Sequence, residues 1–347
     1  MMDALFLQVI GGVFLLLYGV RLTGQGFELA FGAKLSRLWV GPGGGRFRAF
    51  GAGVLSTSLI QSSGAVVAMV VSFTEIAPLS LPQSLAVVLG ADLGSTVTIQ
   101  ILSFRIYQYA FLVVSIGVIL SLWGRKGTLR AIGQGILGFG LLLLALKFLA
   151  GAASEIGSVT SLRLLMVDLA QAPLVSFLLG VLLSALFQSG TAVMILLIAF
   201  SQQGVLPLPA VLPLVLGANV GGTSLAFTAS SGLAAEGRRV AWGHLLMKTV
   251  GAALFLPFFS AAQGFLSLMS PDPSRIVANA HTMFNFTLAI LFFPPSSPAC
   301  PPPSAGWFPG RHPWSPRGCR PTWTGTICPR PGQPSDRWRG RSCGWRT

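Results

Sequence analysis

Two stretches of the sequence that lie 127 residues apart are built alike. Residues 53–96 and 180–223 align without a gap, and 19 of the 44 aligned positions are identical. Chance similarity between apolar segments would not preserve polar residues, glycines and a proline at one fixed offset. The chain is therefore predicted to contain an internal repeat. The shared landmarks are Gln61-Ser62 with Gln188-Ser189, Pro82 with Pro209, and "LGADLGST" with "LGANVGGT".

Apolar runs dominate the chain, which is 52% hydrophobic and only 9% charged. A soluble domain usually has about 25% charged residues, so the composition indicates a polytopic membrane protein. A cleavable signal peptide is the weaker interpretation of the first run, because many further runs follow it. Segments 24–39 and 155–170 mix charged and apolar residues, and the first of them is predicted to lie in the membrane interface. The predicted spans are 5–22, 80–103, 106–123, 130–150, 207–229, 238–260 and 276–293.

Two further apolar runs, 48–77 and 174–203, are interrupted by polar residues. Each arm has about 12 residues and makes about 18 Å of helix, too short for roughly 30 Å of hydrocarbon. The runs are therefore predicted to be re-entrant hairpins. Each repeat then has three true crossings, and an odd number places the second repeat upside down relative to the first.

The predicted fold is an all-α polytopic membrane protein with two inverted-topology repeats, each with three spans and a re-entrant helical hairpin. The N-terminus is predicted outside, because that orientation gives ten basic residues in cytoplasmic segments against three outside. The predicted parts are a first transport repeat (1–127), a second transport repeat (128–262), an additional transmembrane helix (263–293) and a tail (294–347).

The tail differs abruptly in composition from the rest of the chain. It holds eight arginines against one acid, 13 of the 23 prolines and all four cysteines. Its cysteine spacing fits neither a CxxC pair nor a zinc site. We expect the tail to be disordered or the product of a shifted reading frame, and we assign it no function.

The hairpin tips are polar groups placed at membrane depth. Gln61-Ser62-Ser63-Gly64 and Gln188-Ser189-Gly190-Thr191 each precede a second helical arm. The N-terminal amides of that arm favour an anion, and the Ser and Thr hydroxyls add donors for phosphate-like oxygens. The glutamine carbonyls suit a hard cation such as sodium. The alternative is that these residues only cap the broken helices or form hydrogen bonds between helices.

A second pair of polar segments lies mid-span, at 90–96 and 217–223. Their closely spaced glycines suggest unwound helices whose free carbonyls could take a cation. Asp92 is an acid inside a predicted span, where charge is costly, so it is predicted to bind sodium or carry a proton. A hydrogen-bonded structural acid is the alternative. The candidate residues here are Asp92, Ser95, Thr96, Asn219 and Thr223.

Two histidines lie in the last predicted spans. His281 and Asn285 are one turn apart on one helix face, and both are candidate ligands. His244 is followed one turn later by Lys248, which cannot snorkel easily from mid-helix and is therefore expected to face polar groups. A packing or hydrogen-bonding role is the alternative for each histidine.

From about residue 8 to 293 the chain resembles the sodium-dependent phosphate cotransporter family. The similarity lies in the paired Gln-Ser hairpins, the "GANVGGT" segment, an Arg-Arg…His segment and "ANAHTMFN". The resemblance implies phosphate transport coupled to sodium, with Gln61, Ser62, Ser63, Gln188 and Ser189 forming the sites. It is closest to bacterial members, which implies the inner membrane of a bacterial cell. Sodium is expected at Gln61, Gln188 and Asn219.

The sequence departs from the family pattern at several of these places. Gly64 and Gly190 stand where serines are usual, although Thr191 offers a hydroxyl beside the second. Asp92 stands where asparagine is usual, and Met247-Lys248 where Phe-Asn is usual. An extra acid and an extra cation are expected to alter the ion stoichiometry.

The leading hypothesis is a secondary transporter that moves inorganic phosphate with sodium by alternating access between the two hairpins. The alternatives are a phosphate exporter, a carrier of another oxyanion, a channel, or a truncated membrane protein without transport. An enzyme is not expected, since no nucleophile–base set occurs, and neither a cofactor nor nucleic-acid binding is expected. The expected partners are phosphate, sodium and the lipid bilayer. The sequence does not decide whether the chain forms a homo-oligomer.

Overall fold

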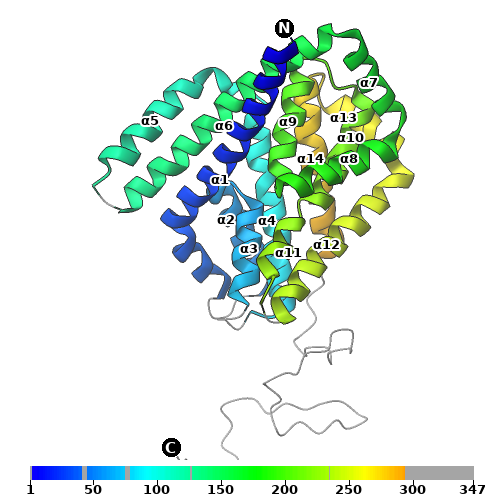
Figure 1. The fold of residues 1–347 in the computed structure, drawn as a ribbon. Helices are drawn as coiled ribbons and strands as arrows, with labels where there is room; N and C mark the ends of the chain where they lie inside the picture. The colour runs from blue at the N-terminus through cyan, green and yellow to red at the C-terminus, as the bar shows by residue number, and fades with distance from the viewer. Residues whose placement is uncertain (1, 41–44, 75–78, 126, 234, 294–347) are drawn as a thin grey trace, which may run out of the picture. The chain divides into compact units, whose positions relative to one another are not determined.

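The computed structural model describes residues 2–40, 45–74, 79–125, 127–233 and 235–293. Regular structure in these residues is entirely helical (Figure 1). Within these described residues, six helices are long and apolar enough to cross a membrane, or seven if Thr160–Gln171 and Pro173–Phe187, bent by 107°, form one span. The prediction of an all-α, multi-pass membrane protein is confirmed, whereas the inversion of the second repeat and the domain boundaries stay predictions. The tail, 294–347, lies outside the described residues.

The helices follow the predicted segments closely. They are α1 (Met2–Val40), α2 (Arg46–Ile60), α3 (Ser63–Phe73), α4 (Leu81–Leu102), η1 (Ile106–Tyr109), α5 (Ala110–Trp123), α6 (Gly127–Ser158), α7 (Thr160–Gln171), α8 (Pro173–Phe187), α9 (Gly190–Gln202), α10 (Leu208–Gly221), α11 (Ser224–Ser230), α12 (Ala235–Phe255), η2 (Leu256–Phe258), α13 (Phe259–Met269) and α14 (Pro273–Phe292).

The first helix differs from its prediction. Residues 5–22 and 24–39 form one continuous helix, α1, instead of a span followed by a separate interfacial segment. No proline interrupts this stretch, and its glycines are used for close packing on α6. A Cβ on Gly26 would overlap the backbone of Gly135, and one on Gly19 would lie 2.8 Å from the amide nitrogen of Leu142. Close packing of these glycines on α6 therefore favours a continuous helix through its charged half.

The sequence repeat is also a repeat of helix packing. A Cβ on Gly90 of α4 would overlap the carbonyl oxygen of Phe50 in α2. The equivalent contact occurs 127 residues later: a Cβ on Gly217 of α10 would overlap the carbonyl oxygen of Phe177 in α8. Glycines thus bring each broken helix into backbone contact with the helix that carries the second polar segment.

Gly53 allows a direct test of this packing. We expect Gly53→Ala to lower the free energy of unfolding by about 1–3 kcal/mol, because the new Cβ would overlap the carbonyl oxygen of Val87. Gly51→Ala in the same helix is the matched control, since a Cβ there meets nothing within 4 Å. The control should be neutral or slightly stabilising. Unfolding in mixed micelles measures both, and equal stabilities for the two variants would contradict the packing.

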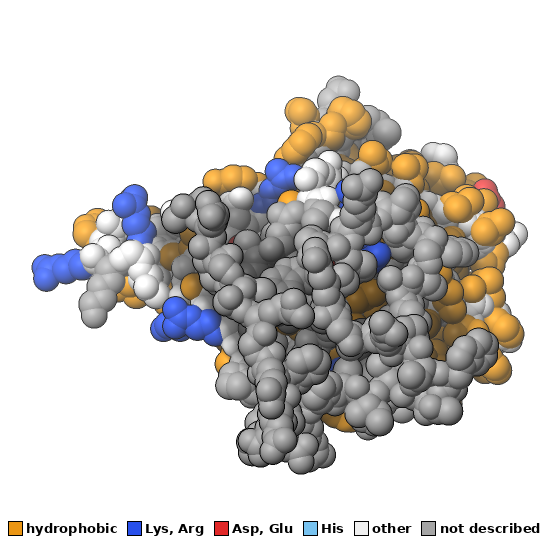
Figure 2. Space-filling view, turned by 90° about the horizontal axis from the view of Figure 1, so that it is seen from below, with side chains coloured by type: hydrophobic (Ala, Val, Ile, Leu, Met, Phe, Trp, Pro, Cys, Tyr) orange, Lys and Arg blue, Asp and Glu red, His pale blue; other side chains and the backbone are white. Residues whose placement is uncertain are grey.

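Apolar side chains cover the outside of α5, where only Ala110 and Gly117 are buried. Phe111, Leu112 and Trp123 are more than half exposed, as expected for a helix that faces lipid. Seen from below, hydrophobic side chains line the flank, and Lys and Arg side chains lie on and around the lower face (Figure 2).

Candidate functional site

Two helix breaks of the same geometry lie at the predicted hairpin tips. α2 ends at Gln61, which has φ 66°, and α8 ends at Gln188, which has φ 51°. Both glutamines adopt the left-handed conformation that commonly ends helices. The next residue caps the following helix: Ser62 Oγ accepts from the amide of Ala65, and Ser189 Oγ from the amide of Ala192, both at 3.2 Å. Each tip therefore ends one helix and starts another.

The two tips open onto one cavity of about 580 Å³. The N-termini of α3 and α9 both line it, together with parts of α1, α4, α10, α12 and α14. The cavity is large enough for a polyatomic anion with several water molecules. Both tips therefore line the same cavity.

The glycine at each tip, Gly64 in the first and Gly190 in the second, has a packing reason. A Cβ on Gly64 would lie 2.7 Å from the Leu225 side chain, and one on Gly190 would lie 3.2 Å from the carbonyl oxygen of Ala218. The loss of a serine at each place lets α10 and α11 approach the helix N-termini. Thr191 lines the cavity and supplies a hydroxyl beside Gly190.

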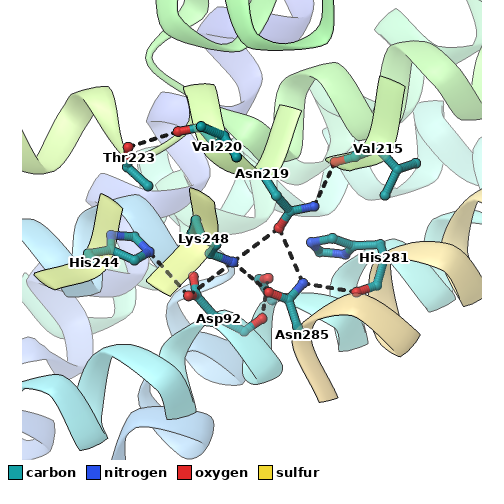
Figure 3. Close-up of polar contacts among 10 residues, drawn as sticks. Asp92, Val215, Asn219, Val220, Thr223, His244, Lys248, His281 and Asn285 are labelled. Carbon is teal, nitrogen blue, oxygen red and sulfur yellow. Dashed lines mark hydrogen bonds and ion pairs between the residues drawn. The ribbon is translucent and has the colours of Figure 1, made fainter. Parts of the chain in front are cut away.

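A buried polar network forms one wall of the cavity (Figure 3). Asp92 Oδ2 lies 3.0 Å from Lys248 Nζ and 3.1 Å from His244 Nε2. Lys248 Nζ also donates to Asn219 Oδ1 at 3.1 Å and to Asn285 Oδ1 at 2.5 Å. All five side chains are buried. The expectation that Lys248 faces polar groups is confirmed, and its charge is balanced by Asp92.

The predicted site residues divide into two groups. The first lines the cavity: Ser62, Ser63, Asp92, Ser95, Gln188, Ser189, Thr191, Asn219 and His281. The second does not line it: Gln61, Thr96, Thr223 and Asn285.

Residues of the second group have other hydrogen-bond partners. Gln61 Oε1 accepts from Thr98 Oγ1 at 3.0 Å, which ties the first tip to α4. The Thr96 hydroxyl donates to the carbonyl of Leu93 in its own helix, and the Thr223 hydroxyl donates to the carbonyl of Val220 near the end of α10. Asn285 lies behind the cavity wall and contacts Lys248.

The predicted unwinding at 90–96 is wrong. α4 is helical from Leu81 to Leu102, because Gly90 and Gly94 are contact points with α2 and need no free backbone. At 217–223 the helix does break: α10 ends at Gly221, and α11 begins at Ser224. Only the second segment therefore has the interruption that its glycines suggested.

Several cavity residues were not predicted as site residues. His244 and Lys248 lie on the α12 wall, and Arg21, Gln25 and Glu28 line the cavity from α1. Arg21 lies within the candidate span Leu5–Trp39, which the continuous helix α1 forms. A charge in the middle of an apolar helix was the available signal. In the described part of the chain, no three His, Cys, Asp or Glu residues are grouped to hold a metal ion.

A model of one protein family matches the chain twice. The family is described as Na+/Pi-cotransporter, and the matches cover residues 15–151 and 155–291. Each match contains one helix break and one of the paired polar segments. No solved structure matches the chain.

Curated relatives extend the comparison. The chain is 31% identical over 288 residues to a protein of Escherichia coli (strain K12) named "Putative inorganic phosphate export protein YjbB". That alignment covers 83% of this chain and 53% of the relative, so the chain spans about half the length of the relative. It is also 28% identical over 249 residues to "Uncharacterized protein YqeW" of Bacillus subtilis (strain 168), covering 71% of this chain and 80% of that protein.

Proposed function

Since the chain belongs to the Na+/Pi-cotransporter family, we propose that it carries inorganic phosphate across the membrane, coupled to sodium, by alternating access. The family is one of transporters of the membrane, and the resemblance seen in the sequence is thereby confirmed. The observation that supports this function best is the cavity between the two serine-capped helix N-termini. We assign no cofactor to the process.

The anion is held by the starts of α3 and α9. The first amides of a helix have no acceptor within it, so those of Ser63, Gly64, Gly190 and Thr191 can donate to phosphate oxygens. The positive ends of two helix dipoles add to this attraction, each worth about 0.3–1 kcal/mol. Hydroxyls of Ser63 and Thr191 supply further donors at the cavity wall. Two helix ends facing one space favour an anion with several oxygens.

Sodium is proposed near the second tip. Gln188 lines the cavity and offers an amide carbonyl. Gln61 Oε1 and Asn219 Oδ1, the other predicted ligands, already accept hydrogen bonds from Thr98 and Lys248. We therefore assign the coupling ion to Gln188 and nearby carbonyls, and we give Gln61 the role of holding the first tip on α4.

Export is the second candidate, and the observation that favours it is the printed name of the relatives. Four curated relatives are named as phosphate export proteins. The same cavity serves either direction, because the ion gradient and not the site decides net movement in a coupled carrier. Both candidates therefore predict the same binding residues.

Proteoliposomes containing the purified full chain test the function. Radioactive phosphate should accumulate when a sodium gradient points inward and should leave loaded vesicles when the gradient is reversed. Flux that ignores the sodium gradient would remove sodium coupling from the proposal. No flux above that of empty vesicles would remove phosphate transport altogether.

Gln188→Gly separates a binding role from a structural one. Glycine adopts the left-handed backbone without steric cost but adds freedom to the unfolded chain, so stability should stay within about 1 kcal/mol of wild type. Sodium-driven phosphate uptake should nevertheless fall at least tenfold, because the amide is lost. Arg105→Gly is the matched control, since Arg105 has φ 53° and does not line the cavity. Wild-type uptake by Gln188→Gly would show that this side chain binds neither ion.

A further inference from the structure

Lys248 ends in a cage of oxygen atoms. Its ammonium nitrogen lies 3.0 Å from Asp92 Oδ2, 3.1 Å from Asn219 Oδ1 and 2.5 Å from Asn285 Oδ1. The three oxygens come from three helices, α4, α10 and α14, and the lysine reaches them from a fourth, α12 (Figure 3). The lysine side chain is 3% exposed. It is therefore held inside the protein and not at a surface.

The hydrogen bonds of this ammonium are complete. A lysine ammonium has three N–H donors, and three oxygen acceptors surround this one. No donor is left over for a phosphate oxygen. Lys248 lines the cavity. Its ammonium is nevertheless bound by oxygen atoms of the protein, so the geometry favours that role over direct binding of phosphate.

The same oxygens suit a small bound cation. A carboxylate and two amide carbonyls are the ligand types that hard cations take. Asp92 and Asn219 occupy equivalent positions of the two repeated stretches, so the two halves of the chain face each other across this point. Two of the three oxygens around the ammonium thus come from equivalent positions of the repeated stretches.

We propose that Asp92, Asn219 and Asn285 form a monovalent-cation site that the Lys248 ammonium fills as a tethered ion. This inference rests on the proposed sodium coupling and refines it. The ammonium of Lys248 occupies this site permanently in place of a sodium ion. Each transport cycle therefore uses one sodium ion fewer than it would if the site were free to bind sodium. Sodium acts only at the second tip.

Lys248→Asn tests the site directly. The shorter side chain removes the ammonium and leaves space beside the oxygens of Asp92, Asn219 and Asn285. Binding of radioactive sodium to the purified full chain should rise by one ion per chain relative to wild type. The thermal midpoint of the variant should also be higher in sodium chloride than in N-methyl-D-glucamine chloride, by more than it is for wild type.

Asp92→Asn/Lys248→Asn is the matched control. It removes both charges together, so the sodium gained by the single variant should be lost again. An unchanged number of bound sodium ions in Lys248→Asn would overturn the proposal, as would unfolding of that variant in both salts. The test measures sodium binding alone, so the absence of phosphate flux in wild type would refute the proposed function without deciding the presence of this site.

Discussion

Replacing Asp92 by asparagine should lower the free energy of unfolding by about 3–5 kcal/mol, the cost of leaving a buried charge without its partner. Lys248 Nζ lies 3.0 Å from the carboxylate and its side chain is 3% exposed, so its charge is poorly solvated without Asp92. His244 loses the same partner. Reversible unfolding in mixed micelles of mild detergent and dodecyl sulfate measures the change.

The double variant Asp92→Asn/Lys248→Asn distinguishes a lost charge pair from a lost side chain. Both charges are absent in it, so at least half of the stability lost in Asp92→Asn should return. A single variant within about 1 kcal/mol of wild type would contradict the view that these two groups compensate each other's burial. A double variant that is less stable than Asp92→Asn would contradict it as well.

Replacing Ser189 by aspartate should reduce phosphate uptake about 100-fold at low phosphate concentration. Aspartate caps helices as well as serine does, so α9 should keep its start. The new carboxylate lies at the cavity wall, where two like charges about 6 Å apart repel by about 3 kcal/mol at an effective dielectric constant near 20, which is about 100-fold in affinity. Initial uptake rates in proteoliposomes, taken at several phosphate concentrations, measure the loss.

Ser189→Asn is the matched control, because asparagine is neutral, is close in shape to aspartate and is an equally good helix cap. It should keep uptake within a few-fold of wild type. The same pair of changes at Ser62 should behave alike, since Ser62 caps α3 with the same geometry. If aspartate and asparagine reduced uptake equally, the shape of the side chain and not its charge would cause the loss of uptake, and the proposed anion site would be wrong.

The broken helices were predictable from the sequence because their signal is local and occurs twice. A glutamine followed by a serine inside an apolar run has few explanations in a membrane. The fixed offset between Gln61 and Gln188 then excludes chance. The structure has both glutamines in the left-handed conformation and both serines as helix caps.

The glycine-rich segments were harder to interpret, since glycine permits two opposite outcomes. It can unwind a helix, or it can let two helices touch. At Gly90 and Gly94 the second outcome holds, because α2 packs there against backbone atoms. The choice depends on a neighbour that is distant in sequence, so the segment alone could not decide it. The same reason explains why the continuous α1 was not foreseen.

The buried network was only partly predictable. A lysine in the middle of an apolar helix indicates polar neighbours, and Asp92 indicates a buried partner. Which residues meet is set by the packing of α4, α10, α12 and α14, and the most distant of them, Asp92 and Asn285, are 193 positions apart in the sequence. The sequence therefore predicted that Lys248 and Asp92 each need a polar partner, but it did not predict that the two residues form a pair with one another.

Equilibrium binding of radioactive phosphate to the purified full chain tests the central claim most directly, namely that the cavity between the two serine-capped helix starts is the anion site. Wild type and Ser189→Asn should bind one phosphate per chain, and Ser189→Asp should bind it about 100-fold more weakly. Equal binding by all three proteins would contradict the account, as would the absence of phosphate binding to wild type.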